Sequence, residues 1–106
     1  MSSYRYRITV EKIADAKGDP VPGQSLSFYA ANHDDILAIV SRLQERLPFD
    51  ASTTASLGVG LKLFSEVVLN HRSDAMFEAI RPALREFIQK LKQQSSREEL
   101  ASAQMD

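Results

Sequence analysis

The stretch LSFYAANHDDILAIV, residues Leu26–Val40, decides the fold because its hydrophobic period changes midway. Leu26, Phe28 and Ala30 occupy every second position, which is typical of a β-strand with one apolar face. From Ile36 onward the apolar residues follow the spacing of an amphipathic helix. The polar tetrapeptide NHDD between the two patterns either caps that helix or contributes to an acid/base or metal site.

The N-terminal residues predict a second strand that pairs with the first. In YRYRITV, residues 4–10, aromatic and aliphatic side chains alternate strictly with polar ones. The connecting segment IADAKGDPVPGQ, residues 13–24, contains two glycines and two prolines and predicts a long, proline-stiffened loop. An isolated two-stranded hairpin is only marginally stable in water. We therefore expect helices from the rest of the chain to cover the apolar face of the hairpin.

Three helices are predicted after the hairpin, over about residues 33–47, 51–69 and 74–92, each from apolar residues at helical spacing. Pro48 ends the first helix, and Pro82 either kinks the third or marks its restart. The fold class is α+β, with an N-terminal antiparallel β-hairpin packed on three helices in a single domain over residues 1–92. The segment 93–106 is polar and predicts a frayed or disordered tail, although Ser96 and Glu99 have the spacing of a capping box.

The middle helix is predicted to have neighbours on two sides, because its polar stripe is narrow. A second copy of the chain is one candidate for the second neighbour. Gly58 and Gly60 lie within this helical pattern, where they either permit close backbone approach or mark an irregular start. Their spacing does not match a phosphate-binding loop. In the third helix, the spacing of Phe77, Ile80, Leu84, Phe87 and Leu91 favours a core stripe over a coiled-coil seam.

Composition excludes several classes of protein. Thirteen Lys and Arg against 14 Asp and Glu leave a net charge of −1, so electrostatics does not indicate nucleic acid or a membrane surface as a partner. The absence of cysteine excludes disulfide scaffolds, thiolate metal sites and cysteine nucleophiles. No signal-peptide pattern and no run of about 18 apolar residues is present, so we expect a cytoplasmic protein that is neither exported nor embedded in a membrane.

The NHDD segment is explained by helix capping without a ligand. If Asn32 is the N-cap, His33, Asp34 and Asp35 fill the first turn, where carboxylates interact favourably with the helix dipole. Successive helical side chains point about 100° apart, so these three cannot easily converge on one metal ion. A metal site would need help from Glu66 or from a residue such as His71, which follows a helix C-terminus and is well placed to interact with the negative end of the dipole.

Lys62 and Glu66 are four residues apart and are expected to pair on the surface of the middle helix. No nucleophile, base and orienting group can be assembled from the sequence, so no catalytic residue, metal ligand or cofactor is assigned. A speculative ligand site remains as an alternative, if folding brings two groups together. Its residues would be His33, Asp34, Asp35, Lys62 and Glu66.

The stretches NHDDI, GLKLFSEVVLNHR and MFEAIRPALREFIQKLK resemble a family of small bacterial proteins known as domain of unknown function three-eight-six-one. The similarity covers about residues 4–92. It implies an α+β fold of a hairpin and helices, and it implies no activity, cofactor or ligand.

Two functions follow as hypotheses. The first is a small protein-interaction or regulatory domain that self-associates as a homodimer and binds an as yet unidentified protein, because the middle helix is broadly apolar and the hairpin has edges that can pair. The alternative is a small-molecule or metal-binding protein, and possibly an enzyme, whose site lies near His33 and Glu66.

Overall fold

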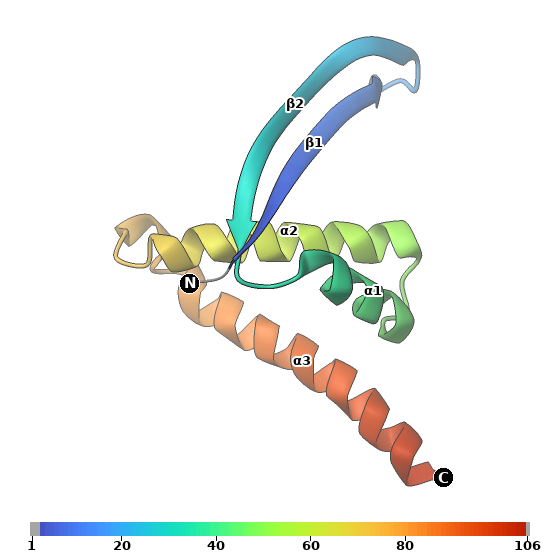
Figure 1. The fold of residues 1–106 in the computed structure, drawn as a ribbon, viewed down its shortest axis with the longest axis vertical. Helices are drawn as coiled ribbons and strands as arrows, with labels where there is room; N and C mark the ends of the chain where they lie inside the picture. The colour runs from blue at the N-terminus through green and yellow to red at the C-terminus, as the bar shows by residue number, and fades with distance from the viewer. Residues whose placement is uncertain (1–2, 106) are drawn as a thin grey trace. The chain divides into compact units, whose positions relative to one another are not determined.

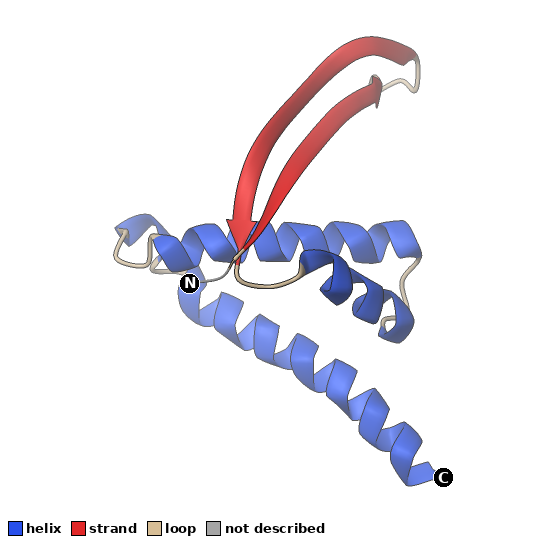
Figure 2. Ribbon diagram, in the orientation of Figure 1, coloured by secondary structure: helices blue, strands red, loops and turns tan. Residues whose placement is uncertain are grey.

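The computed structural model describes the backbone of residues 3–105 and the side chains of residues 3–93. The chain is α+β, as predicted, with an antiparallel hairpin followed by three α-helices (Figures 1 and 2). It divides into two compact units, residues 1–34 and 35–106, which are described separately. The elements are β1 (Tyr4–Ala14), β2 (Pro20–Asn32), α1 (Ile36–Arg46), α2 (Ala51–Asn70), a 3₁₀-helix η1 (Ala75–Phe77) and α3 (Ile80–Met105).

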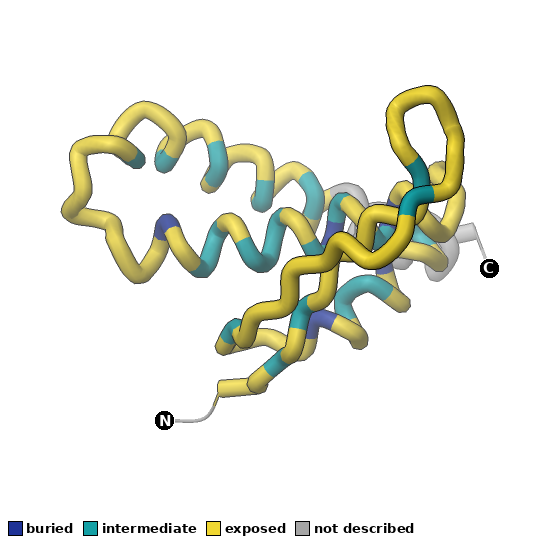
Figure 3. Tube along the Cα trace, turned by 90° about the horizontal axis from the view of Figure 1, so that it is seen from above, coloured by how far each residue is buried: buried dark blue, intermediate teal, exposed yellow. Residues whose placement is uncertain are grey.

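The first unit is the hairpin of β1 and β2, whose register places like side chains opposite each other. Ile8 pairs with Phe28 and Val10 with Leu26, so the apolar positions of both strands share one face. This apolar face is poorly covered around Val10 and Leu26, which remain 60% and 61% exposed. Figure 3 shows most of the hairpin trace as exposed. The expectation that helices cover the hairpin stays a prediction.

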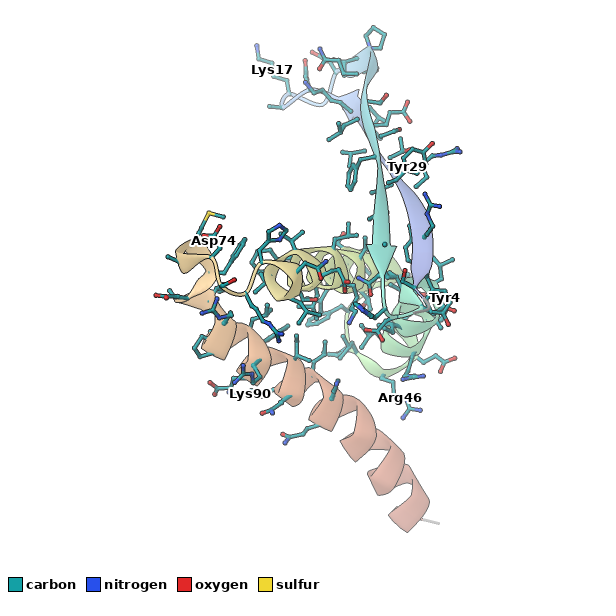
Figure 4. All side chains as sticks on the ribbon, turned by 60° about the vertical axis from the view of Figure 1, so that its left-hand side comes forward. Tyr4, Lys17, Tyr29, Arg46, Asp74 and Lys90 are labelled. Atoms are coloured by element: carbon teal, nitrogen blue, oxygen red, sulfur yellow. The ribbon has the colours of Figure 1, made fainter. Side chains whose placement is uncertain are left out.

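The opposite face of the hairpin is held by polar cross-strand pairs. Thr9 Oγ1 and Ser27 Oγ share a hydrogen bond of 2.9 Å. The guanidinium of Arg7 lies over the ring of Tyr29, 5.9 Å from its centroid, at cation–π distance. The Tyr29 side chain is labelled on the hairpin in Figure 4. The face that carries these pairs is polar and suited to solvent. The face that lacks cover is therefore the apolar one.

The connecting loop is shorter than predicted. The strands run to Ala14 and from Pro20, so both prolines of the predicted loop belong to β2. A two-stranded sheet has only edge strands, and proline is tolerated there where its nitrogen is not required to donate. The remaining turn is closed by Asp15, whose Oδ1 accepts hydrogen bonds of 2.9 Å from the backbone N–H groups of Lys17 and Asp19. Gly18 adopts φ = 90°, a conformation that favours glycine.

The second unit is built on the contact between α1 and α2. An ideal Cβ placed on Gly58 would lie 2.9 Å from Cγ2 of Val40 and 3.5 Å from Cδ1 of Leu43. Gly58 therefore permits close backbone approach, as one of the two sequence interpretations predicted. Gly60 has nothing within 4 Å of its ideal Cβ. Among the residues whose side chains are described, the buried hydrophobic ones are Ile36, Leu43, Leu47 and Val68.

The predicted third helix, 74–92, is wrong at its start. Asp74 caps the short η1 instead, with its Oδ1 accepting from the backbone N–H of Met76 at 2.9 Å (Figure 4). The α-helix begins at Ile80, which places Pro82 in the first turn, where its missing N–H has no intrahelical partner to lose. Of the two alternatives predicted for Pro82, the start of a new helix is therefore the correct one, and a kink is not.

The stripe expected to form the core of α3 is only partly covered. Ile80 and Phe87 are exposed, whereas Leu84 and Leu91 are half-buried. The backbone of α3 continues helically to Met105. The prediction of a frayed or disordered tail over 93–106 stays a prediction, and the side chains from residue 94 onward lie outside the described residues. Within the described part of the chain, none of the helices is both long and apolar enough to cross a membrane.

Candidate functional site

The segment between β2 and α1 is fixed by local hydrogen bonds. Asn32 is only 1% exposed, and its Oδ1 accepts a hydrogen bond of 3.0 Å from the backbone N–H of Asp34. The Tyr6 hydroxyl donates to the backbone carbonyl of Asp34 at 3.0 Å. This Asx turn sets the path of the chain through the NHDD residues. The residues His33 and Asp34 are exposed.

The helix begins three residues later than predicted, and the capping residue is Asp35. Its backbone is extended (φ −78°, ψ 96°), and its Oδ1 accepts from the backbone N–H of Ala38 at 3.2 Å. The prediction that Asn32 is the N-cap, with His33, Asp34 and Asp35 in the first turn, is therefore wrong. The sequence contained two further residues that can act as N-caps, Asp34 and Asp35, and propensity does not separate them from Asn32.

The other two candidate residues lie together on α2. Lys62 and Glu66 are one helical turn apart, and both are half-buried. The pairing of Lys62 with Glu66 that the sequence predicts stays a prediction. His33 and Asp34 belong to the first compact unit, whereas Asp35, Lys62 and Glu66 belong to the second. The convergence of the five residues into one ligand site is therefore also still a prediction.

A metal site at His33 or His71 requires further ligands grouped with the imidazole. Among the described residues, no three His, Asp or Glu side chains are grouped so that they could hold a metal ion. His71 instead follows the end of α2, where its Nδ1 lies 2.9 Å from the carbonyl oxygen of Val67. The predicted position of His71 at the negative end of a helix dipole is confirmed.

Asp50 caps α2, and the pKa of its carboxyl group is shifted. Its Oδ1 accepts from the backbone N–H of Thr53 at 2.7 Å and caps α2. This hydrogen bond lowers the pKa of the Asp50 carboxyl below its ordinary value of 3.8, because it stabilises the ionised form. The shift is that of a helix cap and does not indicate acid/base chemistry.

The most unusual feature of the molecule is apolar surface, which the sequence interpretation underestimated. Side chains predicted to face a core are exposed on both units, including Val10 on the hairpin and Phe87 on α3. Hydrophobic periodicity shows which residues share a face, but it carries no information about what covers that face. The broadly apolar character of α2 was the available signal.

Comparison with known proteins identifies the family to which this fold belongs. Residues 4–93 match the model of a family described as a domain of unknown function with solved structure, DUF3861. The chain belongs to this family. The predicted resemblance and its approximate extent are therefore confirmed. No curated protein matches the chain significantly.

A solved structure of similar fold is consistent with membership in DUF3861. It is the crystal structure, at 2.20 Å resolution, of a protein of unknown function from Pectobacterium atrosepticum. The two sequences are 29% identical, the TM-score is 0.75, and the match covers 87% of this chain and 99% of the other. The family and this relative establish the fold and leave the activity to be inferred from the chain itself.

Proposed function

We propose that this member of DUF3861 is a protein-interaction or regulatory domain that acts as a homodimer. The observation that carries the proposal is the ratio of buried to exposed hydrophobic side chains. Among the described side chains, four hydrophobic ones are buried, and 14 large hydrophobic ones are exposed. Monomeric proteins expose single hydrophobic residues routinely, but large exposed apolar surfaces mark interaction sites.

The energetics of a small domain support the same proposal. Native stability is a small difference between burial and conformational entropy, and a chain of this length depends on a well-filled core. Among the described side chains only four hydrophobic ones are buried, so this core contributes little to the free energy of unfolding. Burial of the exposed set in a homodimer supplies the missing apolar contacts, because homodimer interfaces are rich in apolar area.

The hairpin offers a second surface that suits an interaction domain. The described sheet has two strands, so each strand has one edge whose backbone groups are not paired within the sheet. Such an edge can accept a strand from another protein by β-augmentation. A cytoplasmic location remains part of the proposal and is supported by the cysteine-free composition.

The test is the mass of the native protein in solution. Size-exclusion chromatography with light scattering, run across micromolar concentrations, is expected to give twice the chain mass of 11.8 kDa. The thermal midpoint is expected to rise with protein concentration, because association stabilises the folded state by mass action. A species that stays monomeric throughout, with a midpoint independent of concentration, rules out the homodimer.

A further inference from the structure

One side of α2 faces solvent without carrying any charge. Its members are spaced three or four residues apart, so they lie along one side of the helix. We call this surface the α2 face, and it consists of Thr53, Ser56, Gly60, Phe64 and Val67, all of which are exposed. Phe64 is 44% exposed and Val67 is 48% exposed.

The polarity of α2 is therefore the reverse of that expected for a helix on a protein surface. The exposed side of a surface helix normally carries its charged residues. In α2 the two charged residues, Lys62 and Glu66, are half-buried on other sides of the helix, whereas the exposed side is uncharged. This arrangement is typical of a helix whose exposed side is covered by a partner.

No contact among the described residues explains the glycine at position 60. Glycine destabilises a helix interior relative to alanine. Gly58, two residues earlier, is required by the close approach of Val40, but the space around Gly60 is open. The α2 face thus has open space and no side chain at Gly60, and it has a 44% exposed ring at Phe64, one turn further along. A surface that presents both an exposed ring and open space can be complementary to itself.

We propose, resting on the homodimer proposed above, that the α2 faces of two copies pack antiparallel about a two-fold axis. Phe64 of each copy packs on Gly60 of the other. In a two-fold interface each contact occurs twice, so this pair also places Val67 of one copy opposite Leu57 of the other. Gly60 is then explained as the site where the partner helix approaches most closely.

Charge favours a second copy as the occupant. A second α2 face brings no charged group into the contact, so no ion is desolvated. The α2 face supplies two large exposed hydrophobic side chains, Phe64 and Val67. A standard interface takes about 800 Å² from each partner, so the contact extends beyond these two residues.

The first test places a charge at position 60 of the α2 face. Gly60→Glu meets open space and replaces glycine with a better helix former, so the monomer fold is retained. We expect its dimer dissociation constant to rise at least tenfold, with unchanged far-UV circular dichroism. The matched control is Ser41→Glu, which adds the same charge to an exposed position of α1 and is expected to leave the dimer intact.

The outcomes of this test separate the two proposals. A Gly60→Glu variant that dimerises like the wild type overturns the α2 contact but leaves the homodimer standing, with another surface as its interface. A wild-type protein that is monomeric overturns both proposals. Loss of the dimer in both variants alike overturns the α2 contact, because the effect is then one of charge and not of position.

The second test uses the absence of cysteine from the chain, which makes introduced thiols unique. Leu57→Cys and Val67→Cys proteins are prepared separately, mixed to allow subunit exchange, and oxidised. We expect a disulfide-linked dimer in the mixture and none in either protein alone. In the antiparallel arrangement, identical positions lie about 15 Å apart along the helix, beyond the roughly 7 Å limit between Cα atoms. Cross-linking of either variant alone, or none in the mixture, overturns the proposal.

Discussion

Gly58 of α2 and Val40 of α1 approach so closely that a Cβ on Gly58 would lie 2.9 Å from Cγ2 of Val40. Real Cβ contacts are essentially never this short, and the β-branched side chain of Val40 has little rotamer freedom in a helix with which to move aside. The glycine therefore sets the distance between the two helices that form the core of the second unit.

Gly58→Ala is expected to destabilise the protein despite the better helix propensity of alanine. Overpacking of this kind costs about 1–3 kcal/mol in free energy of unfolding. Adding Val40→Ala should relieve the clash, so the double variant is expected to show a favourable coupling of about 1 kcal/mol in a urea-denaturation double-mutant cycle. Simple additivity of the two changes would show that the helices separate at no cost.

The sequence predicted those features that depend on local pattern. Strict alternation from Tyr4 to Val10 determines which side chains share a face, and a register slip of one residue would invert that face, so the hairpin was predictable. The cap at His71 was predictable because the helical pattern ends there. The start of α1 was not, since Asn32, Asp34 and Asp35 are all good N-cap residues and only the tertiary path of the chain selects Asp35.

Features that depend on what covers a surface could not be predicted from the sequence. The periodicity of α3 correctly places Ile80 and Phe87 on one stripe, but their exposure depends on packing distant in the chain. The same limit applies to the candidate site. Spacing indicates that Lys62 and Glu66 share a side of α2, and it says nothing about which other groups approach them.

Asn32 is expected to be important for stability. Its side chain is almost fully buried and accepts a hydrogen bond from Asp34 N, so Asn32→Ala leaves a donor without its partner. We expect a loss of about 1–3 kcal/mol in free energy of unfolding. Asn70→Ala, at an exposed asparagine, is the control and should cost less than about 0.5 kcal/mol. Equal effects of the two substitutions, measured by urea denaturation, would refute a special role for the Asx turn.

Thr54 offers the opposite experiment, in which a substitution is expected to stabilise the protein. The residue is fully buried, and its Oγ1 has no hydrogen-bond partner among the residues that the structure describes. Replacing the hydroxyl by a methyl group of similar size in Thr54→Val should raise the free energy of unfolding by about 1 kcal/mol. Thr54→Ser, which keeps the hydroxyl and removes the methyl group, is the control and is expected to lower the free energy of unfolding. Destabilisation by Thr54→Val would reveal that the hydroxyl has a partner such as an ordered water.

The cap at Asp50 predicts a specific dependence of stability on pH. Because the Thr53 backbone N–H holds the pKa of the Asp50 carboxyl below 3.8 in the folded state, the ionised group stabilises the fold. This contribution is complete well above pH 3.8 and is lost as the pH falls through the lower, folded-state pKa. Asp50→Asn retains a capping oxygen but does not titrate. The difference in denaturation midpoint between wild type and Asp50→Asn should therefore favour the wild type at neutral pH and shrink as the solution is acidified below pH 3.8. A difference that stays constant across that range would show that the charge of Asp50 contributes nothing to the cap.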